Sequence, residues 1–179
     1  YPHCDGFENM HENLGLVNAS YPDKPILFTE GTVENFSPEK YQHWPNAERY
    51  GFSMIRDFNR GTVGWTDWNL LLDQTGGPNH VSNFCFAPIH GDTSTGELIY
   101  TPTYYYIGHF SKFVGPGSVR ISTSVSRNVV LATSFLNEDG TMATIVMNKS
   151  DEPIDYSFFL KDEQIDLNIP ARAMQTLVY

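Results

Sequence analysis

Hydrophobic positions in the first sixty residues follow a helical period twice, with a strand-like run between the two. Residues 7–20 carry an apolar side chain every three or four positions, which predicts an amphipathic helix. After a turn with two prolines, the apolar run 26–28 predicts a buried strand over residues 25–30. Residues 31–44 show no period and predict a loop. A second helix is predicted from Pro45, a residue suited to a first helical turn, to about Gly61.

Residues 62–113 continue this alternation. Residues 62–72 are rich in Thr, Val and Trp, and they predict a buried strand that becomes polar toward its end. The segment Gly76-Gly-Pro78 interrupts the strand, and a long loop is predicted to about residue 101. Residues 104–113 predict a short aromatic helix. The order helix, strand, helix, strand, helix indicates an α/β unit with parallel strands.

The pattern changes near Gly115-Pro-Gly117, and the rest of the chain alternates like antiparallel sheet. The turn signal Asn137–Gly140 joins two of the predicted strands as a hairpin. Strands are predicted over residues 119–125, 129–135, 142–147, 154–160, 165–169 and 174–178. We therefore predict two domains, residues 1–114 and residues 115–179, the second being a small antiparallel β-sandwich.

Composition narrows the possible partners. A hydrophobic content of 40% with 14% aromatic residues is typical of a folded protein. The 11 basic and 21 acidic residues give a net charge of −10, which disfavours nucleic acid and anionic membranes as partners. No apolar run approaches the roughly 20 residues of a transmembrane helix. The chain starts at Tyr1 without a methionine, which we interpret as a processed or truncated end.

Neither cysteine nor histidine spacing indicates a metal site. Cys4 and Cys85 are far apart, and we interpret both as free or buried thiols. Four histidines show no ligand spacing and are interpreted as polar core or surface residues: His43, His80, His90 and His109. We therefore expect neither a metal nor a cofactor. Three Asn-x-Ser sites, at residues 18, 35 and 148, permit a secreted origin without establishing one.

Glu30 ends the first predicted strand and is followed at once by Gly31, which can turn the chain. In a β/α barrel, active-site residues lie where strands end and loops begin. A carboxylate at such a place can attack a carbon, take a proton or only cap a turn. Our interpretation is that Glu30 is a catalytic nucleophile.

Four motifs occur in order along the chain: Phe28–Gly31 (Phe-Thr-Glu-Gly), Gly64–Asn69 (Gly-Trp-Thr-Asp-Trp-Asn), Gly76–Asn79 with Val81–Phe84, and Tyr106–Phe113. Together they resemble glycoside hydrolase family 30, the glucosylceramidase-like β-glycosidases, over essentially the whole chain. The resemblance implies the last strands and helices of a (β/α)8 TIM barrel, followed by a side β-sandwich.

The resemblance also implies roles for individual residues in a retaining mechanism. Glu30 matches the nucleophile that ends the seventh barrel strand. Trp68 on the eighth strand and Asn83 after the Gly-Gly-Pro loop match residues that border the glycone site. Tyr1 matches a tyrosine that reaches the nucleophile, although the His-Trp pair that precedes it in the family would lie before this chain.

Some residues near these motifs have two interpretations. Trp65 and Trp68, three apart on one predicted strand, should face opposite sides, one toward the helices and one toward the site. Asp67 is either a structural hydrogen-bond acceptor or, less simply, a second catalytic carboxylate. Three aromatic residues after Glu30 either shape an aglycone cleft or only hold a long loop: Phe36, Tyr41 and Trp44. Trp44 is kept as a candidate substrate-binding residue.

The chain departs from the family pattern in one respect. A retaining glycosidase uses two carboxyl groups about 5–5.5 Å apart, and the family's acid/base glutamate follows an asparagine at the end of the fourth strand. No Asn-Glu-Pro segment exists here, and Asn137-Glu138 lies in a predicted hairpin of the second domain. We therefore expect the C-terminal portion of such an enzyme, inactive without its upstream segment.

The leading hypothesis is a retaining β-glycosidase that acts on β-glucosides such as glucosylceramide or β-1,6-linked glucan, through a glycosyl-enzyme intermediate on Glu30. Its expected partners are the glycolipid or glucan substrate and the upstream remainder of the barrel. The expected location is extracytoplasmic, whether secreted, periplasmic or lysosomal, with sphingolipid metabolism as one setting. The alternative is a non-catalytic carbohydrate-binding or accessory module, because the β-sandwich is the only complete domain.

Overall fold

The structure of the chain is a computed structural model that describes residues 8–179. Its contacts divide the chain into two compact units, one that ends at Gly108 and one that extends from His109 to Tyr179. Tyr1 and Cys4 lie outside the described residues.

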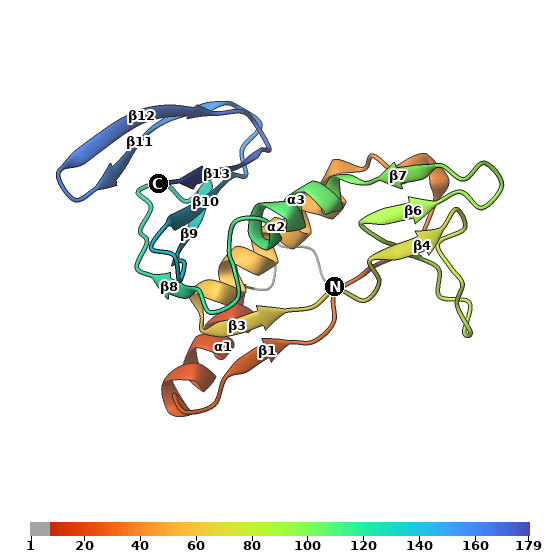
Figure 1. Cartoon of the computed structure of the whole chain (residues 1–179), viewed down its shortest axis with the longest axis horizontal. Coiled ribbons are helices and arrows are strands. Elements are labelled where there is room, and N and C mark those ends of the chain that lie inside the picture. Colours follow the sequence, from red (N-terminus) through yellow and green to blue (C-terminus); the bar gives the residue numbers. More distant parts are fainter. Residues whose placement is uncertain (1–7) are drawn as a thin grey trace. The chain divides into compact units, whose positions relative to one another are not determined.

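The first unit contains a β–α–β arrangement. Helix α1 (Glu8–Ser20) precedes strand β1 (Ile26–Phe28), and helix α2 (Trp44–Asn59) leads to strand β3 (Thr62–Trp65). Strands β1 and β3 pair in parallel, with Phe28 opposite Trp65 (Figure 1). Parallel neighbours need a crossover connection, and α2 supplies it. The predicted order helix, strand, helix, strand is therefore confirmed here, but the loop predicted over residues 31–44 also contains a two-residue strand, Val33–Glu34.

The sequence of helix α2 carries a signal for its beginning and another for its end. Pro45 lies in its first turn, where the missing N–H costs nothing. One face is buried, through Ala47, Tyr50, Phe52, Met54 and Ile55 among others. Beyond the helix, Gly61 has a left-handed φ of +100°, and a Cβ there would collide with the Asn18 side chain of α1. A glycine at this position therefore ends α2 and lets α1 lie close to it.

Short strands between residues 33 and 100 form two more small sheets. Strand β2 (Val33–Glu34) pairs antiparallel with β5 (Cys85–Phe86). Strand β4 (Leu71–Asp73) lies parallel to β6 (Ile89–Gly91), which pairs antiparallel with β7 (Leu98–Tyr100) (Figure 1).

These strands correct the prediction for this region. The single strand predicted over residues 62–72 is instead two strands, β3 and β4, that belong to different sheets. The predicted long loop to residue 101 contains three strands, β5, β6 and β7. Strands of two or three residues are too short to show an alternating pattern, so hydrophobic periodicity could not reveal them.

His90 is a fully buried residue of this region. Its Nδ1 lies 2.8 Å from the Asp73 carbonyl oxygen, and its Nε2 accepts from the Ala87 N–H at 2.9 Å. These two partners fix a neutral ring with the proton on Nδ1, and burial lowers the His90 pKa. The interpretation of His90 as a polar core residue is confirmed, and the buried Cys85 is a free thiol.

The second unit begins with the last residues of helix α3 (Pro102–Ser111). The rest of it is an antiparallel β-sandwich. One sheet has the order β13–β10–β9–β8, with β8 (Val119–Ile121), β9 (Val130–Leu136), β10 (Met142–Asn148) and β13 (Met174–Val178). The other is the hairpin of β11 (Ile154–Leu160) and β12 (Glu163–Ile169) (Figure 1). The core cluster of the sandwich contains Val130, Ala132, Val146, Ile154 and Ile169. The predicted sandwich is confirmed.

The predicted turn between β9 and β10 is also confirmed. The Asn137 N–H donates to the Thr141 carbonyl oxygen at 2.8 Å, and Gly140 has a φ of +87°. The Asp139 carboxylate accepts from the Thr141 hydroxyl at 2.7 Å and lies in the turn itself. This turn includes Glu138, so that carboxylate belongs to a hairpin of the second unit.

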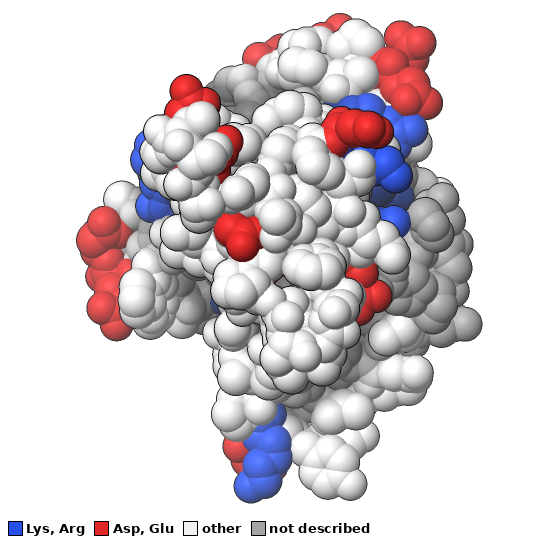
Figure 2. Space-filling model, turned by 90° about the vertical axis from the view of Figure 1, so that its right-hand side faces the viewer, with Lys and Arg blue, Asp and Glu red and all other residues white. Residues whose placement is uncertain are grey.

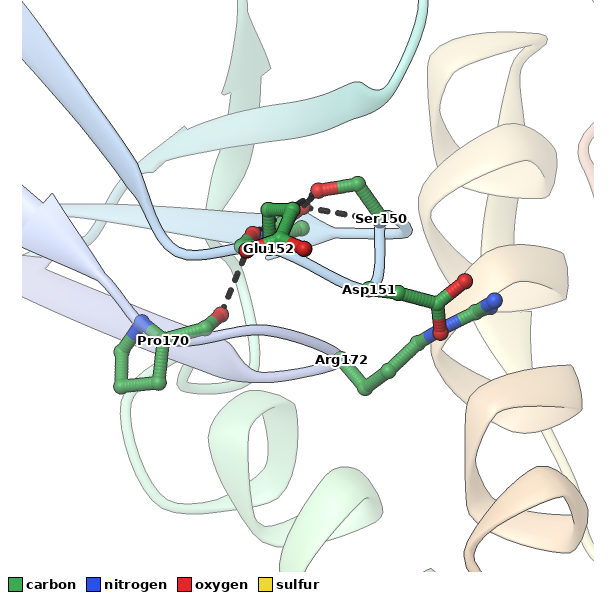
Figure 3. A network of polar contacts seen from close by, with 6 residues as sticks. Ser150, Asp151, Glu152, Pro170 and Arg172 are labelled. Atoms are coloured by element: carbon green, nitrogen blue, oxygen red, sulfur yellow. Dashed lines mark hydrogen bonds and ion pairs between the residues drawn. The ribbon is translucent and has the colours of Figure 1, made fainter.

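Asn148, at the end of β10, is fully buried and joins two turns of the sandwich. Its Nδ2 donates to the carbonyl oxygens of Glu152 at 2.8 Å and Pro170 at 3.0 Å. Its Oδ1 accepts from the N–H of Ser150 at 2.9 Å. Figure 3 shows this network together with the exposed Arg172–Asp151 ion pair, whose atoms lie 2.9 Å apart.

Charged side chains are scattered over the face in Figure 2. Acidic and basic groups lie in small clusters separated by uncharged surface. None of the helices in the described part of the chain is long and apolar enough to cross a membrane.

We predict that Asn148→Ala lowers the free energy of unfolding of the chain by about 3 kcal/mol, because it leaves buried backbone groups without partners. Urea denaturation followed by circular dichroism measures the change. Asp151→Ala is the control within the same network. Its ion pair with Arg172 is exposed, so its effect should be much smaller. Equal losses for the two variants would contradict the assigned role of Asn148.

Candidate active site

Glu30 is exposed and lies two residues beyond the end of β1. The next residue, Gly31, is buried against an aromatic pair in which Phe28 and Trp65 stack with their ring centroids 4.4 Å apart. A Cβ at Gly31 would lie 2.6 Å from the Trp65 ring and 3.2 Å from the Phe28 ring. Glycine is therefore needed here because the backbone passes directly over the two rings.

Trp68 is joined to the segment after Glu30 through its backbone. The Thr66 N–H donates to the Phe28 carbonyl oxygen at 2.9 Å, and the Trp68 N–H donates to that of Gly31 at 2.8 Å. The Trp68 side chain is 50% exposed. The sequence had led us to expect Trp68 on the strand, but it lies beyond the end of β3. It remains beside the Glu30 loop.

Trp65 has a different environment from Trp68, as predicted. Its ring lies against Phe28 and against Tyr50 of α2, with a Tyr50–Trp65 centroid distance of 5.3 Å. Its indole N–H donates to the Asp57 carboxylate at 3.0 Å, and Asp57 also lies 2.9 Å from Nδ1 of the buried His11. Trp65 therefore belongs to the packing between helices and strands.

Beside this packing lies a cavity of about 290 Å³ between α1, α2, β1 and β3. Apolar side chains such as Leu14 and Phe52 form most of its lining, together with Trp65 and the His11–Asp57 pair. Glu30, Trp68 and Asn83 do not line it, so we assign this cavity to helix packing and not to the candidate site.

Asn83 is exposed on the loop that precedes β5. Its Nδ2 donates to the Glu34 carboxylate at 2.9 Å, and Glu34 is on β2, four residues after Glu30. Its carbonyl oxygen accepts from Nδ2 of Asn79 at 2.5 Å. The loop that carries Asn83 is therefore joined to the segment that follows Glu30, in addition to the β2–β5 pairing.

Trp68 also borders an open depression of about 610 Å³, whose other lining residues are Asn69, Pro78, Asn79 and His80. An aromatic face beside amide and imidazole groups offers both stacking and hydrogen bonding to a sugar. Sequence reasoning missed Asn69, Asn79 and His80 as site candidates. Their signal was their position, since Asn69 ends one motif, Asn79 ends the first segment of the next, and His80 follows Asn79 directly.

Asp67 lies between Trp65 and Trp68 and is largely withdrawn from solvent. Its Oδ1 accepts from the Tyr50 hydroxyl at 2.8 Å and from the Trp68 N–H at 3.0 Å. Its Oδ2 is buried and has no hydrogen-bond partner among residues 8–179. Burial raises the Asp67 pKa from 3.8 to about 6, although its two donors act in the opposite direction. Asp67 is therefore a hydrogen-bond acceptor, as the first of its two interpretations expected.

The other described candidates make different contacts. Trp44 begins α2 and is 44% exposed, and its ring lies edge-on to Tyr106 at a centroid distance of 5.7 Å. Phe36 contacts Tyr41 at 5.5 Å and Phe86 at 5.0 Å, so these rings hold the loop after Glu30. Tyr1 lies outside the described residues.

Two models of known protein families match the chain. The model of the glycosyl hydrolase family 30 TIM-barrel domain matches residues 3–114. The model of the glycosyl hydrolase family 30 beta sandwich domain matches residues 117–177. The chain belongs to glycosyl hydrolase family 30. Its fold is a portion of the TIM barrel followed by the β-sandwich domain of this family.

Among similar curated proteins, putative glucosylceramidase 3 of Caenorhabditis elegans is 36% identical over 174 residues, which cover 93% of this chain and 33% of that protein. Lysosomal acid glucosylceramidase of Mus musculus is 34% identical over 145 residues, or 79% of this chain and 28% of that protein. The chain thus spans about a third of the length of these relatives.

Solved structures show the same fold. SrfJ from Salmonella typhimurium superposes with a TM-score of 0.88 at 33% identity, over 94% of this chain and 38% of that one. An endo-β1,6-glucanase superposes with a TM-score of 0.81 at 26% identity, over 93% of this chain and 38% of that one.

We predict that the Asp67 carboxyl titrates near pH 6 and that Tyr50→Phe raises this midpoint, because the lost hydroxyl donor favoured the charged form. The raised pKa also determines in which direction the stability of the fold changes with pH. The protonated Asp67 favours the fold fully below about pH 4, and this contribution is lost as the pH rises through about 6. NMR titration of the carboxyl carbon of the labelled chain measures the midpoint.

Asp92 supplies the control in the same spectrum. It accepts from the Ser94 hydroxyl at 2.5 Å in an exposed loop, and this bond lowers the Asp92 pKa. Asp92 should therefore titrate below its ordinary 3.8 in both the parent chain and the Tyr50→Phe variant. An Asp67 midpoint below that of Asp92 would contradict the burial of Asp67.

Proposed function

We propose that the protein carrying this chain is a retaining β-glycosidase with Glu30 as its nucleophile. The observation that carries the proposal is the placement of Glu30: an exposed carboxylate just beyond a barrel strand, on a backbone held by the Phe28–Trp65 pair and by Trp68. A nucleophile must be held within a few tenths of an ångström of its attack position, which a fixed backbone provides. Membership in the family supports the same conclusion.

In the proposed reaction, the Glu30 carboxylate attacks the anomeric carbon, and the bond from that carbon to the leaving oxygen breaks. A second carboxylic acid gives its proton to that oxygen. The resulting glycosyl ester is then hydrolysed by a water molecule, which the second group, now a carboxylate, deprotonates. Trp68 offers a flat aromatic face, and Asn83 an amide, to the glycone sugar.

We propose that the second carboxyl group comes from a segment outside this chain. Asn137-Glu138, the Asn-Glu pair considered from the sequence, lies in the β9–β10 turn of the second unit. General acid catalysis alone typically contributes 10²–10⁴-fold. The chain by itself should therefore not turn over a glycoside, and its expected partner is the remainder of the barrel.

The proposed substrates are β-glucosides, either a glycolipid such as glucosylceramide or a β-1,6-linked glucan. The support is the naming of relatives as glucosylceramidases and of a solved neighbour as an endo-β1,6-glucanase. A role in sphingolipid metabolism and an extracytoplasmic location, lysosomal or secreted, belong to the same proposal. Residues 1–114 would form the barrel portion and residues 115–179 the sandwich.

We predict that a 2-fluoro β-glucoside with a good leaving group labels Glu30 in the full-length protein, because the fluorine slows hydrolysis of the glycosyl ester. Peptide mass spectrometry locates the label. Glu30→Gln should lower kcat on an aryl β-glucoside on the order of 10⁴-fold or more, since removing a nucleophile abolishes the covalent route.

Glu34→Gln is the matched control, a second exposed glutamate four residues along. It should keep the label on Glu30, because its amide can still contact Asn83. A label on another carboxylate, with none on Glu30, would disprove the assignment of the nucleophile.

We further predict that Trp68→Ala lowers kcat/KM about tenfold, in line with the 0.5–1.5 kcal/mol of a specific aromatic contact. Trp44→Ala tests the other exposed tryptophan. Because the Trp44 ring lies against Tyr106, its loss should affect thermal stability more than kcat/KM. Steady-state kinetics of both variants on one aryl glucoside separates the two residues, and a larger kcat/KM loss for Trp44→Ala would reverse their roles.

A further inference from the structure

We propose that Asp67 is a positioning residue of this site: its carboxylate fixes the backbone of Trp68 and, through it, the loop that carries Glu30. The inference rests on the proposed glycosidase function, since it explains how the nucleophile and the glycone-side tryptophan are kept in one arrangement. It assigns Asp67 no contact with substrate.

The first step of the argument is the pair of donors on one oxygen. Oδ1 of Asp67 accepts from the Tyr50 hydroxyl at 2.8 Å and from the Trp68 N–H at 3.0 Å. Tyr50 is only 5% exposed, and burial and the adjacent carboxylate raise its pKa well above the ordinary value. The hydroxyl therefore stays protonated and always donates, so α2 holds Asp67 from one side.

The second step is the position of the Trp68 N–H, which is shared between two acceptors. Besides Asp67, it donates to the Gly31 carbonyl oxygen at 2.8 Å. Gly31 follows Glu30 directly, and its Cα has no free space on the side of Trp65. A shift of the Trp68 backbone therefore moves a backbone hydrogen-bond donor that the Glu30 loop receives from this segment.

The third step is the cost of a carboxylate at this place. Oδ2 of Asp67 is buried and has no partner among the described residues, which is unfavourable for an ionisable group. An aliphatic residue would avoid that cost if only packing mattered. The carboxylate offers instead a charge-assisted bond to two donors at once, and such bonds are short and directional. A buried ionisable group kept at such a cost is typical of a functional site.

The experiment uses the full-length protein and compares Asp67→Ala, Asp67→Asn and Tyr50→Phe, each measured well below its melting temperature. Asp67→Ala should lower kcat/KM by 10- to 100-fold, because a displacement of about 1 Å at a site can cost a factor of this size. Asp67→Asn retains an Oδ1 acceptor for both donors and should recover most of that loss. Tyr50→Phe keeps the ring against Trp65 and should cause a smaller loss in the same direction.

Thermal melting is recorded for every variant, with Asp92→Ala as the control for a carboxylate in an exposed loop away from these contacts. If Asp67→Ala lowers the melting temperature but leaves kcat/KM unchanged, Asp67 is only structural and the proposal is wrong. If Asp67→Ala does not fold, Tyr50→Phe decides: an unchanged kcat/KM overturns the proposal, and a reduced one supports it.

Labelling of the parent protein separates this inference from the proposed function. A labelled Glu30 together with a fully active Asp67→Ala variant overturns the positioning role alone. An unlabelled Glu30 overturns the proposed nucleophile, and with it the loop that Asp67 would be positioning.

Discussion

The contact between Gly31 and the ring of Trp65 is the constraint on which the candidate site depends. A Cβ at residue 31 would lie 2.6 Å from the Trp65 ring, so any other residue here would have to displace that ring. The Phe28–Trp65 stack lies beneath it and joins the ends of the two parallel strands. The direction in which Glu30 leaves the strand is thus set by packing between strands and not by the loop that follows.

Trp65 is linked to two carboxylates with different surroundings, to Asp57 directly and to Asp67 through Tyr50. Asp57 accepts from the Trp65 indole and faces His11, so both of its oxygens have partners. Asp67 accepts from Tyr50, whose ring contacts Trp65, but its second, buried oxygen has no partner in the described part of the chain. The well-paired carboxylate is on α2, and the other accepts from the Trp68 N–H. This asymmetry suggests that the first serves packing and the second serves the geometry of the site.

The sequence predicted most of what depends on long periodic segments. Helices α1 and α2 and the longer strands of the sandwich were found because their apolar positions repeat over several turns or pairs. Strand β1 was found from its continuous apolar run. Strands β5, β6 and β7 were missed because their pairing comes from tertiary contacts that no local pattern encodes. At the site, Glu30 and Trp68 were marked by motifs, whereas Asn79 and His80 only acquire meaning once a folded loop places them near Trp68. The need for glycine at residue 31 was expected as a turn and is instead a close approach.

The β1–β3 pair also explains why the proposed activity belongs to a larger protein. Parallel strands occur almost only in sheets that are covered on both faces, and a two-stranded sheet is marginal by itself. Here Leu27 on β1 is 55% exposed and Val63 on β3 is 67% exposed, although both are residues suited to a buried sheet. Further barrel strands beside this pair would cover such side chains and satisfy the open edges. The same strands would bring their own ends, and hence a second carboxyl group, to the rim where Glu30 lies.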